Sequence, residues 1–124
     1  MKTARLITLI GSIALFVTGC LHGAGYLSIV ERVQKESLGA ETAAILKTCW
    51  LVYSVELLSL AIIAFVARTK ERGGTIVLIC GAAVAASGLL MLYFLGPVIG
   101  VYLVCADAVP LVIGGYLQAR TGPD

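Results

Sequence analysis

Residues 75–95 read TIVLICGAAVAASGLLMLYFL, and this stretch contains no charged side chain. A helix rises about 1.5 Å per residue, so about 20 apolar residues are enough to cross a bilayer core of about 30 Å. Three further stretches of the chain meet the same requirement. We therefore predict four membrane-spanning helices, over residues 6–30, 44–67, 75–95 and 98–119.

The composition of the whole chain favours the same class of protein. Of its 124 residues, 60% are hydrophobic and 13% are charged, and the mean hydropathy is +1.02. These values lie outside the range of soluble domains. A chain of this length forms one domain, residues 1–124, without room for a separate soluble catalytic domain. The net charge of +2 is too small to favour nucleic acid as a partner.

The connections between the predicted helices are short, so neighbouring helices must be antiparallel. This predicts an all-α, up-down-up-down bundle of four transmembrane helices. Cytoplasmic flanks of membrane helices hold an excess of Lys and Arg. We expect both termini in the cytoplasm of a multi-pass protein of the cell (inner) membrane, because that arrangement places more of the basic residues inside. The inner set is Lys2, Arg5, Arg68, Lys70, Arg72 and Arg120, and the outer set is Arg32, Lys35 and Lys47.

The first segment also has a second interpretation. Lys2 and Arg5, an apolar run and then VTGC at residues 17–20 resemble a bacterial lipoprotein signal, in which the cysteine is lipidated after cleavage. The apolar run, however, continues past Cys20 to Val30. That length favours an uncleaved transmembrane helix.

One histidine and two acids lie well inside the predicted spans: His22, Glu56 and Asp107. Acids within a membrane normally face the bundle interior and have a partner or a function. At 1.5 Å per residue, both acids lie near the midplane, and His22 lies about 8 Å nearer the outer face. Helical spacing predicts that Tyr53, Tyr102 and His22 line an outer vestibule whose floor holds the two carboxyls.

Two carboxyls close together in a medium of low dielectric constant do not both ionise easily, so one is expected to hold a proton. Such a pair suits proton-coupled transport, proton transfer on a lipid-soluble substrate or binding of a cationic amphiphile. The alternative is structural. In it Glu56 bonds to a nearby hydroxyl, and Asp107 bonds to backbone that Pro110 leaves free.

The remaining chemistry-bearing residues give weaker signals. The four cysteines are Cys20, Cys49, Cys80 and Cys105, one in each predicted helix and with no Cys-x-x-Cys pair, so we expect no thiol oxidoreductase. One histidine and dispersed cysteines make no metal-ligand spacing, and no nucleotide or phosphate motif occurs. We therefore expect neither a metal nor a cofactor.

The layout of four spans in a short chain is similar to that of small multidrug resistance transporters and DoxX-like membrane proteins. The former are known for a glutamate in the first helix, where this chain has His22. The resemblance is one of architecture, and it transfers no functional residue.

Three functions are compatible with the sequence. The leading hypothesis is a protein that binds or transports a hydrophobic or cationic small molecule in a pocket formed by Glu56, Asp107, His22, Tyr53 and Tyr102. The second is a non-catalytic accessory or assembly subunit of a larger membrane complex. The third, an enzyme acting on a lipid-soluble substrate, is less favoured than a non-enzymatic role. We expect the lipid bilayer, a lipophilic small molecule and either a homo-oligomer or a membrane subunit as partners.

Overall fold

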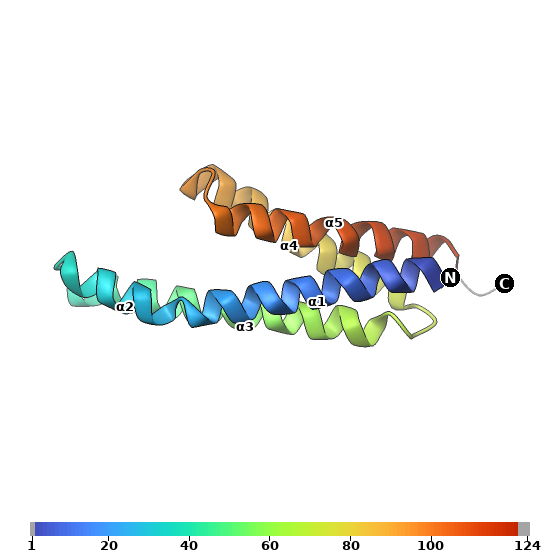
Figure 1. Cartoon of the computed structure of the whole chain (residues 1–124), viewed down its shortest axis with the longest axis horizontal. Coiled ribbons are helices and arrows are strands. Elements are labelled where there is room, and N and C mark those ends of the chain that lie inside the picture. The colour runs from blue at the N-terminus through green and yellow to red at the C-terminus, as the bar shows by residue number, and fades with distance from the viewer. Residues whose placement is uncertain (1, 122–124) are drawn as a thin grey trace.

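The computed structural model describes residues 2–121, and five helices follow one another along the chain (Figure 1). Four spans among these described residues are long and apolar enough to cross a membrane. This confirms the all-α, four-span prediction and indicates a multi-pass membrane protein. The helices are α1 (Lys2–Ala24), α2 (Tyr26–Lys35), α3 (Ala40–Ala67), α4 (Gly73–Leu95) and α5 (Ile99–Arg120).

The first span is longer than predicted, and it is locally irregular at Gly25, although the Gly25 backbone stays in the helical region (φ −67°, ψ −9°). Helix α1 ends at Ala24 and α2 begins at Tyr26, so the helical run continues into the polar segment as far as Lys35. At the break, the Gly25 N–H is shared between the carbonyls of Leu21 and His22, both at 3.1 Å. Helix α3 also begins earlier than predicted, at Ala40. Most residues of these two additional helical segments have an acceptable helix propensity. Because the segments are polar, a hydropathy pattern does not predict that they are helical.

The interior of the bundle combines buried leucines and valines with glycines and alanines that allow close contact between helices. Three glycines spaced seven apart on α4, Gly74, Gly81 and Gly88, lie against α5. A Cβ atom at Gly81 would lie 2.7 Å from the Val112 backbone nitrogen, and one at Gly88 would lie 2.8 Å from Cys105 Sγ. Large apolar side chains instead cover the outside of the bundle. Close backbone approach inside and bulky apolar groups outside are typical of helices packed in lipid.

The helices form two hairpins that are joined firmly at one end. Helix α1 packs against α3 and against α5, and α4 packs mainly against α5. Figure 1 shows both termini at one end of the molecule, which we call the terminal end. There Gln118 Nε2 donates to Thr8 Oγ1 at 2.6 Å and to the Ala4 carbonyl at 3.4 Å, linking α5 to α1.

Toward the opposite end, the two hairpins separate. Figure 1 shows α4 and α5 diverging from α1 and α3 there, and α2 and the start of α3 extending beyond the α4–α5 turn. We call this the α2 end. The α4–α5 turn is formed by Gly96, at φ 75°, and Pro97, and the Val98 N–H donates to the Gly96 carbonyl at 2.9 Å. This divergence opens the space in which the candidate site lies.

Candidate functional site

A groove of about 420 Å³ lies between the separating hairpins at the α2 end. This volume falls within the range of small-molecule sites. Four helices and the α2–α3 connection contribute to the walls, which are mostly apolar. The lining residues are His22, Ile29, Arg32, Val33, Glu36, Leu38, Leu46, Cys49, Trp50, Tyr53, Met91 and Leu95.

His22 is the most firmly held polar side chain of the groove. Its ring stacks on the Trp50 ring, with the centroids 4.0 Å apart and the planes at 14°. The Tyr53 ring meets the same imidazole edge-on at 5.2 Å. The imidazole also contacts Ser54, whose Oγ lies 2.8 Å from His22 Nδ1. The imidazole is therefore fixed by three residues of α3 in one orientation.

One tautomer of His22 is compatible with both hydrogen bonds of Ser54. Ser54 has one hydroxyl proton, and its Oγ lies 2.9 Å from the Trp50 carbonyl, which can accept that proton. The Ser54 oxygen therefore accepts a hydrogen bond from His22 Nδ1–H. Nε2 of the neutral ring is then an acceptor, and within residues 2–121 it has no hydrogen-bond partner.

Trp50 is anchored at the break between α1 and α2. Its indole Nε1–H donates to the His22 carbonyl at 2.7 Å. A Cβ atom on Gly25 would lie 3.0 Å from the Trp50 ring, so glycine at the break lets the indole lie against α1. Trp50 is not among the site residues predicted from the sequence. Its spacing from Tyr53 and Ser54, three and four residues along one helix, is the signal that these residues share a face.

Tyr53 presents a second polar group without a partner. Its ring is half-buried and packs against the core, and its hydroxyl oxygen is buried with no hydrogen bond among the described residues. A buried hydroxyl without a partner is costly, and usually marks a place for a water molecule or a ligand. The structure thus brings Tyr53 and His22 together in one groove.

Asp107 lies deeper, between α5 and α1. It is 7% exposed, and the Thr18 side chain interacts with its carboxyl. Oδ2 is buried and, within the described residues, has no partner. Asp107 does not line the groove.

Glu56 and Tyr102 are placed differently. Glu56 is exposed on α3, so it shares no enclosed pocket with Asp107, and Tyr102 is 57% exposed on α5. Neither residue lines the groove. A charged carboxyl facing hydrocarbon near the centre of a helix costs at least ~2.5–3.5 kcal/mol on insertion scales.

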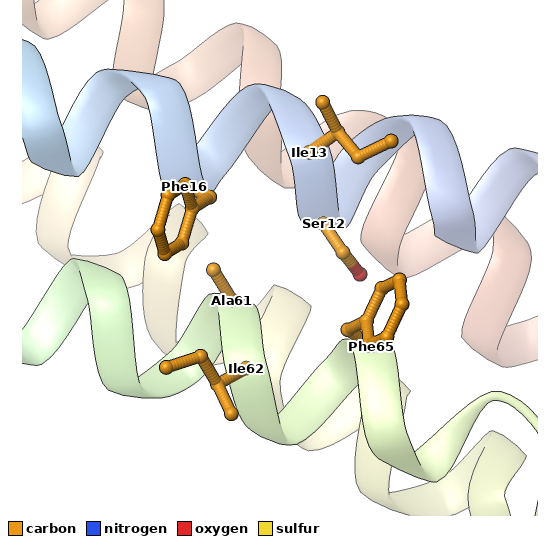
Figure 2. Close-up of a pocket in the computed structure, with 6 residues that line it drawn as sticks. All are labelled: Ser12, Ile13, Phe16, Ala61, Ile62 and Phe65. Carbon is orange, nitrogen blue, oxygen red and sulfur yellow. The ribbon is translucent and has the colours of Figure 1, made fainter.

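A smaller hollow of about 270 Å³ lies between α1 and α3 (Figure 2). Phe16 extends from α1 and Phe65 from α3, on either side of Ala61. The only polar side chain in its lining is Ser12, whose hydroxyl already donates to the Thr8 carbonyl at 2.8 Å. This hollow offers an acyl chain apolar contact but no free polar group.

No cluster of three or more metal-ligating side chains occurs within residues 2–121. Cys20 and Cys49 are exposed, Cys80 is buried and Cys105 is half-buried, and all four are free thiols. Comparison of the chain with protein-family models, with curated proteins and with solved structures found no match.

Proposed function

We propose that this chain is a small-molecule-binding protein of the cell (inner) membrane, with both termini in the cytoplasm. The ligand is a hydrophobic molecule with one hydrogen-bonding or cationic head, and it binds in the groove between the hairpins. The observation that carries the proposal is a mostly apolar groove of about 420 Å³ that holds His22 Nε2 and is lined by Tyr53, whose hydroxyl oxygen is buried; neither polar atom has a hydrogen-bond partner among residues 2–121.

The chemistry of the groove narrows the ligand class. Nε2 of His22 accepts a hydrogen bond, and the Tyr53 hydroxyl can accept one as well. A protonated amine can donate to both, whereas an alcohol donates to His22 Nε2 and accepts from the Tyr53 hydroxyl. The Trp50 and Tyr53 rings also favour a cation over their faces. Leu46, Met91 and Leu95 surround the apolar tail. Arg32 and Glu36 stand at the α2 end of the groove, where a polar head meets water.

The direction of insertion rests on charge. Six of the nine basic residues belong to the ends of α1 and α5 or to the α3–α4 connection, and three belong to the α2 end. The excess at the terminal end favours the cytoplasm for that end. The groove then opens toward the outer side of the membrane.

Trp50 provides a direct test, because it is the only tryptophan in the chain and it lines the groove. Its fluorescence is followed in lipid vesicles during titration with decylamine, decanol and tetraphenylphosphonium. We expect saturable changes with the amine or the alcohol, at lower concentrations than with the phosphonium ion, which has no hydrogen-bond donor.

The matched variants are Tyr53→Phe and Tyr102→Phe. Loss of one hydrogen bond of about 0.5–1.5 kcal/mol weakens binding by about 2- to 13-fold. We expect this loss for Tyr53→Phe and no change for Tyr102→Phe, which lies outside the groove. Fluorescence changes that never saturate, or that are equal in both variants, would refute the binding function and favour an accessory subunit.

A further inference from the structure

Glu56 lies on a continuous exposed seam of α3. The seam follows the alternating three- and four-residue spacing of a helix pair, and each of its residues is exposed. Its members are Cys49, Val52, Glu56, Ser59, Ile63 and Val66. This is the spacing with which one helix packs along another over several turns.

The described part of the chain supplies no partner for the Glu56 carboxyl. At about 1.5 Å per residue, the nearest basic residues on α3, Lys47 and Arg68, lie about 14 and 18 Å away along the helix. No hydrogen bond joins Glu56 to another side chain within residues 2–121. Ser59, one turn away, is a second exposed polar group on the same seam. Both side chains therefore face hydrocarbon unless another molecule covers them.

We propose that the seam binds the same seam of a second copy of this chain, with Glu56 at the centre of the interface. Two copies inserted in the same direction are related by a two-fold axis along the membrane normal, so their α3 helices run parallel. In an isologous interface of this kind, a residue on the axis meets its own counterpart. Glu56 then meets Glu56, and Ser59 meets Ser59.

The chemistry of these two side chains is self-complementary. A protonated carboxyl both donates and accepts a hydrogen bond, and a hydroxyl does the same. A second copy therefore satisfies both residues without a further component. A cationic helix from another protein would have to bring its own charge into the bilayer, which is itself costly. Hydrogen bonding between polar side chains across helices is a common source of association in membranes.

Two native cysteines allow a test in lipid vesicles. Cys49 lies on the seam and also lines the groove, whereas Cys20 is exposed on α1. Oxidation with copper phenanthroline should give a disulfide-linked dimer of the wild type. We expect Cys49→Ser to abolish this dimer and Cys20→Ser to leave it.

The carboxyl is tested by comparing Glu56→Gln with Glu56→Leu. The amide also donates and accepts, so Glu56→Gln should keep the dimerisation constant within about threefold of the wild type. Glu56→Leu should lower it at least about threefold, since an interhelical hydrogen bond of roughly average strength corresponds to that factor. Dimer fraction against protein density in the bilayer is measured by single-molecule photobleaching.

Three results would overturn the proposal: a monomer at every density, cross-linking through Cys20 with none through Cys49, or undiminished dimerisation of Glu56→Leu. Stoichiometric binding of a different, cationic membrane protein to the seam would also overturn it. The Tyr53→Phe variant should dimerise as the wild type does. Failure of the seam and failure of the groove are therefore distinguishable.

Discussion

The contact between His22 and Ser54 in the candidate site predicts which ring nitrogen of the neutral His22 carries the proton. The perturbation is Ser54→Ala, which removes the oxygen that lies 2.8 Å from His22 Nδ1. In the wild type we expect the neutral ring to carry its proton on Nδ1. In the variant, Nδ1–H loses its acceptor, and the proton is expected to shift toward Nε2.

The size of this shift follows from the strength of the lost hydrogen bond. Interhelical hydrogen bonds in membranes average ~0.6 kcal/mol and reach ~1.7 kcal/mol. These energies change an equilibrium by about 3- to 18-fold at room temperature, since RT is about 0.59 kcal/mol. We therefore expect the ratio of Nδ1–H to Nε2–H to fall by about 3- to 18-fold in Ser54→Ala.

The assay is ¹⁵N NMR of histidine-labelled protein at pH 8, where an exposed imidazole is neutral. The chain contains one histidine, so the two ring-nitrogen signals need no assignment to a residue. Ser59→Ala is the matched control, because Ser59 is a serine of the same helix on its exposed side. A wild-type ring that is mainly Nε2–H, or an unchanged ratio in Ser54→Ala, would refute the assignment of the site.

Two further predictions concern the packing that holds the hairpins. In Gly81→Ala, the new Cβ atom would lie 2.7 Å from the Val112 nitrogen, whereas a Cβ atom at Gly100 would have no heavy atom within 4 Å. In denaturant titrations we expect Gly81→Ala to have an unfolding free energy about 1–3 kcal/mol lower than that of Gly100→Ala. Equal stabilities of the two variants would contradict the close α4–α5 contact. Gln118→Leu removes the donor to Thr8 and should lower the unfolding free energy by about 0.6–1.7 kcal/mol, whereas Gln34→Leu, on the exposed side of α2, should leave it unchanged.

The number of candidate membrane spans and their helical type were predictable because spanning a bilayer imposes a length and a composition on each segment. Residues 75–95 satisfy both conditions without reference to any other part of the chain. The break at Gly25 was not predictable in this way. It depends on Trp50, 25 residues later, whose indole bonds to the His22 carbonyl. A tertiary contact of this kind leaves no mark in a hydropathy pattern.

The placement of Glu56 shows why the depth of a residue in the membrane was easier to predict than the rotation of its helix about the helix axis. Both faces of α3 are apolar, so hydrophobic periodicity does not distinguish the bundle interior from lipid. Side-chain size distinguishes them over the second half of α3, where Ala61, Ala64 and Ala67 are buried and Ile62 is exposed, but not at Leu57, which is also buried. Close packing needs small residues inside, and the hydrocarbon accepts large ones outside. The positions of the small side chains on α3 would have indicated that Glu56 does not lie on the same face as the buried alanines. The prediction that Glu56 contacts Asp107 rested only on the similar depth of the two residues in the membrane.

The same distribution of small residues explains where the groove lies. A Cβ atom added at Gly73 would collide with the Ala67 carbonyl, so the end of α3 and the start of α4 lie in close contact at the terminal end. Toward the α2 end, α4 presents Met91 and Leu95 to the groove, and α3 presents Trp50 and Tyr53. Small side chains thus hold the hairpins together at one end, and large ones keep them apart at the other. The groove is a property of the angle between the two hairpins, and its polar groups come almost entirely from the α1–α3 side. In the binding function that we propose, a ligand that bonds to His22 and Tyr53 would meet only apolar side chains from α4, namely Met91 and Leu95.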